Sequence, residues 1–428
     1  MLIKIAKSNV SWLALDRIAR LALGLLVGVL VARYLGPYDY GRLNLSIAYA
    51  GIFAALSTVG LEAVAVSRLA DGHHDQAAVV GTGLMIRLAG SVVAVLLASL
   101  SAALIQGDAA LVILTAISSG VFIAQAGYVL DWLAQAQHRN WIPSVAQTSA
   151  SICSGLVKMW LIIWEADLVW FALSNVAEAA LASLAMFALF RSRRLDISFR
   201  FDGSLARTML TDALPLVISG FAFFIYTRMD LIMLGRIAGE NDVGNYSAAL
   251  RIGEAIGFIP LAFITVGFPK WVRLFGKDRQ AYERNILIDF RRIVVISLVI
   301  SSIVSLSAQS ICQFLYGDRF DDASDILVVS AWISALSVWG FASSRLIIIE
   351  GNANLIVYRN LAGIAVNFVG NAILIPILGA VGSALSTVTA YLCANFLFYA
   401  FSSKLRPLLI LYMRCFLTIP ASFKVQIK

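Results

Sequence analysis

The sequence predicts an all-α integral membrane protein with about twelve transmembrane helices in two six-helix bundles. Of its 428 residues, 60% are hydrophobic and only 14% are charged, whereas about 25% of residues are charged in an average soluble domain. Apolar runs recur along the whole chain, and they reach the roughly 18 residues typical of a membrane-crossing helix. A water-soluble fold of this composition would lack a polar surface, so the bilayer is the expected solvent.

Each predicted span is an apolar run bounded by polar residues or by Gly and Pro. A transmembrane β-barrel would instead show segments of about ten residues with alternating hydrophobicity, and that pattern is absent from the sequence. The first run follows Lys4 and Lys7 and is interpreted as an uncleaved span, because comparable runs follow it. The expected spans are 12–35, 42–66, 80–105, 109–134, 142–164, 168–190, 210–234, 244–268, 291–315, 326–349, 356–377 and 380–401.

The distribution of basic residues predicts how these spans are oriented. One set of loops carries 22 Lys or Arg residues, and the opposite set carries 4, which are Arg33, Arg42, Arg236 and Arg319. Cytoplasmic loops retain the excess of positive charge, so both termini are expected in the cytoplasm. The same asymmetry accounts for the net charge of +8. Nucleic acid is not an expected partner, because no basic cluster is interleaved with aromatic residues.

The predicted domains are an N-terminal bundle (1–190), a cytoplasmic linker (191–209), a C-terminal bundle (210–403) and a cytoplasmic tail (404–428). Because the longest predicted loop has only about 20 residues, no soluble catalytic domain is expected. Within the tail, 408–423 is apolar but interrupted by charge and proline, which favours an interfacial helix. Four distant cysteines and three histidines offer no metal-site or redox spacing, so neither a metal nor a catalytic residue is predicted.

Short matches between the two halves indicate an internal repeat. The stretch 33–41 after the first span and the stretch 236–244 after the seventh share Arg, Gly, Asp and Gly at one register, 203 residues apart. Thr58-Val59-Gly60-Leu61 similarly matches Thr265-Val266-Gly267-Phe268 at an offset of 207. Because six spans separate the matches, both halves enter the membrane in the same direction. Transporters built from such parallel repeats bind their substrate between the halves and alternate access by rocking one half against the other.

The chain resembles the polysaccharide flippases of the multidrug/oligosaccharidyl-lipid/polysaccharide superfamily. The resemblance extends over all twelve predicted spans and is carried by 32–41 (Ala-Arg-Tyr-Leu-Gly-Pro-Tyr-Asp-Tyr-Gly) and by 226–249 with Arg251, Glu254, Pro260 and Pro269. It implies two bundles around a central cavity in a bacterial inner membrane. The implied cargo is an undecaprenyl-pyrophosphate-linked repeat unit of O antigen, capsule or exopolysaccharide. Membrane lipid, and the polysaccharide polymerase or export machinery, are the implied partners.

Arginines within predicted spans are the candidate ligands for this cargo. Ionisable groups at membrane depth are costly and usually face a cavity or a partner, and guanidinium groups bind phosphate through paired hydrogen bonds. The substrate-binding candidates are Arg17, Arg20, Arg87, Arg228 and Arg251. An alternative stays open for two of them, because Asp16 with Arg20 and Arg251 with Glu254 are spaced to form ion pairs on one helix face. Arg345 and Glu62 lie near span ends and could extend toward the headgroups.

Three acidic residues are the ion-coupling candidates, with H⁺ or Na⁺ as the hypothetical ion and no other cofactor expected. Glu178 lies about mid-membrane, and no basic residue is one turn away in its own helix. Desolvation raises the pKa of such an isolated carboxyl, which suits proton coupling, although a neutral carboxyl bonded to a neighbouring helix is an equal alternative. Asp230 and Glu254 are the other two candidates.

Two other functions remain as alternatives. A multidrug exporter of the same superfamily would have an apolar or acidic pocket for organic cations. A membrane polymerase or ligase acting on a lipid-linked sugar would be expected to have an extended loop with convergent acid, base or Arg groups. The loops on the weakly basic side are short, which favours a transporter over an enzyme.

Overall fold

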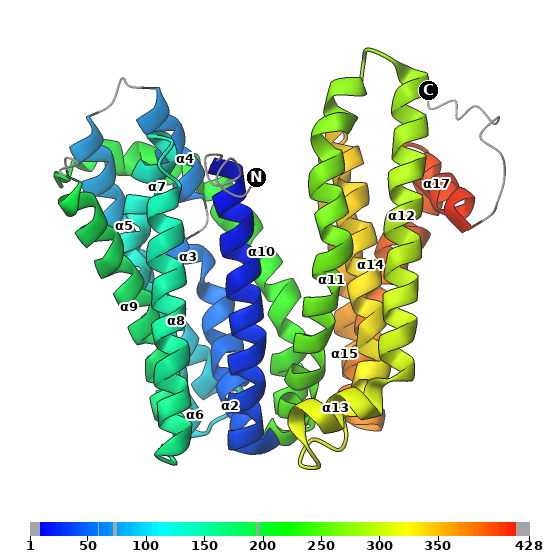
Figure 1. Ribbon diagram of the computed structural model, residues 1–428, viewed down its shortest axis with the longest axis horizontal. Coiled ribbons are helices and arrows are strands. Elements are labelled where there is room, and N and C mark those ends of the chain that lie inside the picture. Colours follow the sequence, from blue (N-terminus) through cyan, green and yellow to red (C-terminus); the bar gives the residue numbers. More distant parts are fainter. Residues whose placement is uncertain (1–8, 59, 72–74, 194–196, 417–428) are drawn as a thin grey trace, which may run out of the picture. The chain divides into compact units, whose positions relative to one another are not determined.

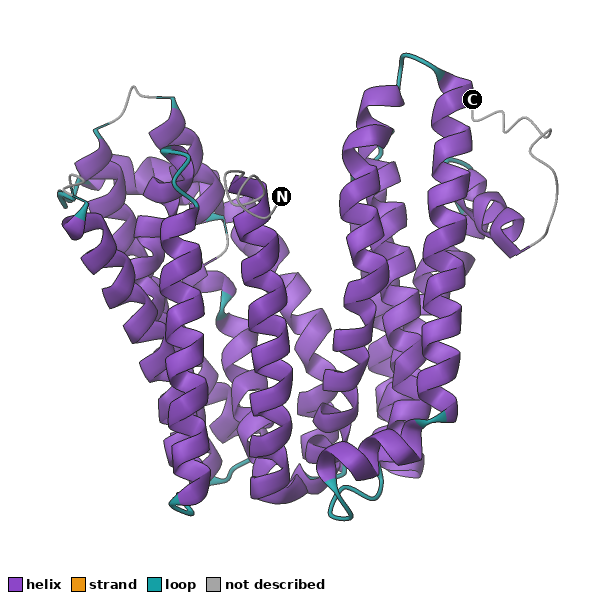
Figure 2. Cartoon of the chain, viewed as in Figure 1, coloured by secondary structure: helices purple, strands orange, loops and turns teal. Residues whose placement is uncertain are grey.

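The structure is a computed structural model that describes residues 9–58, 60–71, 75–193 and 197–416, with side chains from residue 23 onward except at 58, 222 and 416. Within these ranges, the secondary structure consists of helices joined by short loops, and no strand occurs (Figures 1 and 2). The predicted all-α fold is therefore confirmed. The chain divides into two compact units, Met1–Ile232 and Met233–Lys428.

Unit 1 contains nine complete helices and most of a tenth in the part of the chain described. They are α2 (Asn9–Phe53), α3 (Ala55–Thr58), α4 (Leu61–Ala70), α5 (Gln76–Ile105), α6 (Ala109–Ala124), η1 (Gln125–Tyr128), α7 (Val129–Ala136), α8 (Trp141–Ile163), α9 (Leu168–Ser192) and α10 (Gly203–Ile237). The boundary between the units falls inside α10. The predicted domain limits were placed at the ends of predicted spans, whereas the two units are separated by the contacts between their residues. The predicted limits therefore stay a prediction.

Unit 2 contains the remaining helices. They are α11 (Glu240–Leu274), α12 (Arg279–Leu306), α13 (Ala308–Tyr316), α14 (Ala323–Ile349), α15 (Asn354–Leu392), the π-helical turn η2 (Cys393–Leu397), α16 (Phe398–Phe401) and α17 (Arg406–Phe416). The predicted span 291–315 is not one straight helix, because α12 and α13 meet at a bend of 68°.

Two long helices each join two predicted spans through a glycine. In α2 the backbone of Gly36 is non-helical (φ 75°, ψ 173°), and in α15 Gly379 is non-helical (φ 54°, ψ −133°). Positive φ is strained for residues with a Cβ and open to glycine. The glycines therefore mark the boundaries between the predicted spans 12–35 and 42–66 and between 356–377 and 380–401.

Seven described helices are long and apolar enough to cross a membrane, or up to nine if each of two bent helix pairs counts as one span. The seven include the stretch Asn354–Phe401, which is interrupted at Gly379. Its path along the chain, about 72 Å at 1.5 Å per residue, exceeds one roughly 30 Å crossing. Helix α8, which matches the predicted span 142–164, is not among the seven. The chain is a multi-pass membrane protein, and the count of twelve stays a prediction.

Helix α5 is packed as a membrane helix. Its buried ridge consists of small residues, with Ala94, Ala98 and Ala102 fully buried, and small residues allow close packing of helices in lipid. Its leucines point the other way, with Leu100 and Leu104 exposed by 54% and 77%. A helix of a water-soluble protein would bury its leucines, whereas α5 buries alanines and exposes leucines. This arrangement indicates that the exposed face of α5 contacts hydrocarbon.

The internal repeat is visible in backbone conformation. Gly239, which corresponds to Gly36, has φ 98° and ψ 176°, close to the angles of Gly36. The turn after α7 and the turn after α14 also share one hydrogen-bond pattern, because the N–H of Arg139 donates to Ala134 and that of Asn352 donates to Ile347. Both pairs span five residues and lie 213 residues apart. The angles of Gly36 and Gly239 therefore agree with the predicted duplication, whereas the bond pattern is common at helix ends.

The linker before α10 is attached to unit 1. The N–H of Arg200 donates to the carbonyl of Ala77 at 2.9 Å, and the N–H of Asp202 donates to the Thr82 hydroxyl at 3.0 Å. A Cβ on Gly81 would lie 2.4 Å from the Arg200 nitrogen, so the approach requires glycine. Farther along, Arg68 forms an ion pair with Asp212 at 2.6 Å.

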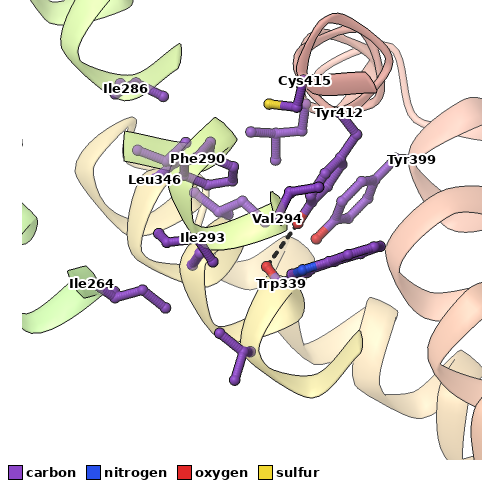
Figure 3. Close-up of a cluster of buried hydrophobic side chains, with 14 of the residues drawn as sticks. Ile264, Ile286, Phe290, Ile293, Val294, Trp339, Leu346, Tyr399, Tyr412 and Cys415 are labelled. Carbon is purple, nitrogen blue, oxygen red and sulfur yellow. Dashed lines mark hydrogen bonds between the residues drawn. The ribbon is translucent and has the colours of Figure 1, made fainter. Parts of the chain in front are cut away.

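The core of unit 2 includes the described part of the tail. Figure 3 shows Tyr412 of α17 among Phe290, Trp339 and Tyr399. Its ring lies 5.9 Å from that of Phe290 and 6.0 Å from that of Trp339. Cys415 is also buried. The tail was predicted as an interfacial segment at 408–423. One face of α17 packs within unit 2, the interfacial placement stays a prediction, and 417–428 lie outside the described residues.

Candidate functional site

The candidate residues fall in both units, and each unit is considered by itself. Arg17 and Arg20 lie in the helical backbone of α2, and their side chains are outside the described part of the chain. In unit 1, Arg228 of α10 lies against α2, because its Cγ and Nε are 3.5 Å from the position that a Cβ on Gly51 would occupy. The absence of a Cβ at Gly51 gives the partly buried arginine room beside α2 at membrane depth.

Arg87 is buried rather than open to a ligand. Only 4% of it is exposed, and its guanidinium carbon lies 5.5 Å from the centre of the Trp132 ring. Glu62 and Asp131 are within its electrostatic reach, and the Gln135 amide connects these acids by donating to Glu62 at 2.8 Å and to Asp131 at 3.4 Å. A bulky cargo could reach Arg87 only after this cluster rearranged.

Glu178 is not isolated. Its Oε1 accepts a hydrogen bond from the Ser151 hydroxyl at 2.6 Å, and its Oε2 lies 3.6 Å from Nζ of Lys158. Both partners belong to α8, whereas Glu178 belongs to α9. The sequence-based premise of an isolated carboxyl is therefore wrong, because the basic neighbour comes from an adjacent helix.

The other acidic candidates differ in exposure. Asp230 is buried, with 8% exposed, and its Oδ1 accepts from the N–H of Leu231 at 2.9 Å. Glu254 of α11 is exposed, and Arg251 is partly buried. Among the residues with described side chains, no ion pair joins Arg251 to Glu254. The alternative that Arg251 and Glu254 form an ion pair on one helix face is therefore not seen in this part of the chain.

A buried polar cluster in α15 escaped the sequence analysis. On one side of Gly379, the Asn371 amide donates to Oδ1 of Asn367 at 3.1 Å. Across the bend, the Asn367 amide donates to the Thr387 hydroxyl at 3.1 Å. Asn371 and Ser383 are both fully buried, and Asn371 Oδ1 and Ser383 Oγ have no hydrogen-bond partner among the described residues.

The two buried oxygens of this cluster without a described partner, Asn371 Oδ1 and Ser383 Oγ, belong to neutral groups. Transporters coordinate Na⁺ with backbone carbonyls where a helix is unwound, and the backbone of α15 is non-helical at Gly379. The signal in the sequence was the i, i+4 spacing of Asn367 with Asn371 and of Ser383 with Thr387, on either side of Gly379. Among the described residues, no group of three or more His, Cys, Asp or Glu is arranged to hold a metal.

Arg359 also differs from its sequence-based assignment. It is one of the 22 basic residues that the sequence analysis counts in the cytoplasmic loops, but it is only 7% exposed within α15. Its guanidinium donates to Gly340 O, Tyr399 Oη and Ser344 Oγ at 3.0–3.2 Å. Because its donors are used inside unit 2, Arg359 is a structural residue.

Comparison with known proteins identifies the family and the fold. The family model described as polysaccharide biosynthesis protein matches residues 6–275, and no curated protein matches. An inward-facing multidrug resistance MATE family transporter of the MOP superfamily has a TM-score of 0.72 at 16% identity, covering 96% of this chain and 98% of its own. The lipid II flippase MurJ, in an inward closed conformation, has a TM-score of 0.71 at 15% identity, covering 96% and 94%.

A third structure, an outward-facing MATE transporter of the same superfamily, has a TM-score of 0.60 at 16% identity, covering 96% of each chain. At 15–16% identity, the structural likeness establishes the fold alone. The family model assigns the chain to the polysaccharide biosynthesis protein family. This fold is the one expected for a transporter rather than an enzyme. The chain belongs to the polysaccharide biosynthesis protein family and has the fold of the MOP superfamily of membrane transporters.

Proposed function

We propose that the chain translocates undecaprenyl-pyrophosphate-linked oligosaccharide repeat units across the bacterial inner membrane by alternating access, with both termini in the cytoplasm. The observation that carries this proposal is the family match over residues 6–275. The products would feed O-antigen, capsule or exopolysaccharide synthesis, where a polymerase or export machinery would receive them.

Arginines at membrane depth support an anionic cargo. Arg228 is held against α2 through Gly51, and no ion pair to Glu254 occupies Arg251 in the described part of the chain. Guanidinium groups bind pyrophosphate oxygens through paired hydrogen bonds, and placing them in the membrane lowers the cost of moving a charged headgroup. A multidrug exporter for organic cations would be poorly served by the same charges.

Surface glycan complementation tests the proposal. Arg17→Glu and Arg251→Glu should each abolish or strongly reduce surface glycan at normal membrane levels, whereas the exposed Arg292→Glu should complement fully. Binding of undecaprenyl pyrophosphate to the purified chain separates the proposed cargo from organic cations. Full complementation by both Glu variants, or preferential binding of organic cations, would contradict the proposal.

The α15 cluster provides a proposal for the coupling ion. Asn371 Oδ1 and Ser383 Oγ are buried oxygens without donors among the described residues, and a bound cation would offset the cost of burying them unsatisfied. Na⁺ is the ion proposed here, with H⁺ at Glu178 as the alternative. Na⁺ should raise the melting temperature of the purified chain relative to K⁺, and Asn371→Leu should remove that difference.

A further inference from the structure

Arg345 of α14 is stacked between two aromatic rings. Its guanidinium carbon lies 4.6 Å from the centre of the Phe341 ring, one turn earlier in α14. It lies 5.1 Å from the centre of the Phe268 ring of α11. Helices α11 and α14 pack against each other in unit 2, so two elements fix one guanidinium. Stacking on aromatic faces restricts a flexible arginine to one plane.

The stacking leaves the N–H donors of Arg345 available. Some other arginines in the described part of the chain have acidic partners, such as Arg42 with Asp108 at 2.8 Å and Arg68 with Asp212 at 2.6 Å. For Arg345, no ion pair and no hydrogen bond from the guanidinium is found among the described residues. Because the five N–H groups of a guanidinium lie in its plane, an edge remains for a ligand even where the rings cover the faces.

Arg359 is an internal comparison for this arrangement. It lies in the same region of unit 2, since it bonds to Ser344, the residue beside Arg345. Its donors are used by Gly340 and Tyr399 as well, and it is almost completely buried. Arg345 is only partly buried. Its guanidinium contacts two aromatic rings, whereas the guanidinium of Arg359 donates to hydrogen-bond acceptors. The two arginines therefore serve different purposes, and only Arg345 is arranged to accept an external anion.

Its position along the helices indicates which anions it can meet. Arg345 lies four residues before the end of α14, and Phe268 lies six residues before the end of α11. Both ends face the cytoplasm in the predicted topology, which places the guanidinium near the inner headgroup layer. The anions at that level are lipid phosphates, and the pyrophosphate of the proposed cargo enters through the same layer.

We propose that Arg345, held between Phe268 and Phe341, is a phosphate-binding site that receives the pyrophosphate of the lipid-linked cargo from the cytoplasmic leaflet. The cargo assignment rests on the proposed function. The guanidinium edge can form two parallel N–H···O bonds to one phosphate group. The rings keep that edge in place before the ligand arrives, which lowers the entropy lost on binding.

Binding measurements on the full chain test this site. The probe is undecaprenyl pyrophosphate, titrated against the purified protein in discs of phosphatidylcholine, with discs containing phosphatidylglycerol as the second arm. Arg345→Gln should weaken prenyl pyrophosphate binding by about tenfold or more, because charge-assisted hydrogen bonds contribute strongly. Phe341→Leu keeps the charge and should weaken binding by about fivefold, because the guanidinium plane is no longer fixed. The exposed Arg292→Gln is the control and should bind like wild type.

The outcomes separate this site from the proposed function. Wild-type protein that does not bind prenyl pyrophosphate would contradict the proposed function itself. Unchanged prenyl pyrophosphate affinity in both Arg345→Gln and Phe341→Leu, with wild-type binding intact, would overturn the site alone. Loss of phosphatidylglycerol binding without loss of prenyl pyrophosphate binding would assign Arg345 to membrane lipid and overturn its role for cargo. Melting curves confirm that each variant is folded.

Discussion

Asp242 of α11 accepts a hydrogen bond from the backbone N–H of Ala380 at 3.1 Å, one residue after the bend at Gly379. The carboxylate thus joins the start of α11 to the start of the second arm of α15 within unit 2. Asp242 is the aspartate of the repeated Arg-Gly-Asp-Gly pattern at 236–244. That sequence pattern therefore has a structural role in fixing where the two arms of α15 diverge.

Replacing Gly379 with alanine should destabilise unit 2. Gly379 has φ 54° and ψ −133°, and a Cβ there would lie 2.7 Å from Oδ1 of Asp242. We expect a loss of about 1–3 kcal/mol from backbone strain, measured as a lower melting temperature in detergent. Gly24→Ala is the control, because a Cβ at Gly24 meets nothing within 4 Å. Equal melting temperatures for the two variants would contradict the role of the bend.

Removing the Tyr412 hydroxyl should loosen α17. The hydroxyl donates to the carbonyl of Trp339 at 2.7 Å and pairs with the Ser343 hydroxyl at 2.5 Å, and the side chain is 1% exposed. Tyr412→Phe should cost about 1–3 kcal/mol, because buried partners are left unsatisfied. Tyr358→Phe, at a position that is 61% exposed, should have almost no effect. Hydrogen exchange in α17 should rise in the first variant only.

Asp202 should stabilise the start of α10 in a pH-dependent way. Its Oδ1 accepts from the N–H groups of Ser204 and Leu205 at 2.9 and 3.1 Å. The bond from the Leu205 N–H, with the bond from the Ser204 hydroxyl, lowers the pKa of this carboxyl below its usual value. A lowered folded-state pKa gives stability that is present above the unfolded pKa of about 3.9 and is lost as the pH falls through the folded value. The melting temperatures of wild type and Asp202→Ala should therefore differ at neutral pH and converge below about pH 4. A constant difference would point to a role other than ionised capping.

Glu178→Gln should separate a structural ion pair from proton coupling. The carboxylate is paired with Lys158 and bonded to Ser151, so we expect the variant to be less stable but to keep the pH dependence of transport. Lys158→Met should give a similar loss, and the double variant should lose less than the sum, because the two side chains interact. Loss of pH-dependent transport in Glu178→Gln alone would restore Glu178 as the proton carrier.

The predicted topology can be checked with reporter fusions. The uneven distribution of basic residues places the loop after Ser192 in the cytoplasm and the loop around Asp167 in the periplasm. Alkaline phosphatase should be active when fused after Asp167 and inactive when fused after Ser192. The reverse pattern would invert the orientation, and activity at both points would put the number of spans in doubt.

The positions of most spans could be predicted because hydropathy is a property of the local sequence. The run 168–190 coincides with α9, and the run 326–349 lies within α14. The bends at Gly36 and Gly379 could be predicted, because each glycine lies at the boundary between two predicted spans. The break between α12 and α13 near Ser307 was missed, because the surrounding sequence contains neither Gly nor Pro and no charged residue.

The candidate site was predicted less completely, because its chemistry depends on which helices are neighbours. The sequence located Glu178 near the middle of a predicted span and Arg345 near the end of another. Only packing decided that Glu178 faces Lys158 across the α8–α9 contact, and that Arg345 lies between Phe268 and Phe341. Composition alone determined that this chain is a helical membrane protein, because burial in lipid depends on hydrophobicity summed along each segment. The partners of its buried charges were decided by the tertiary structure, because contacts between distant segments depend on how the helices pack.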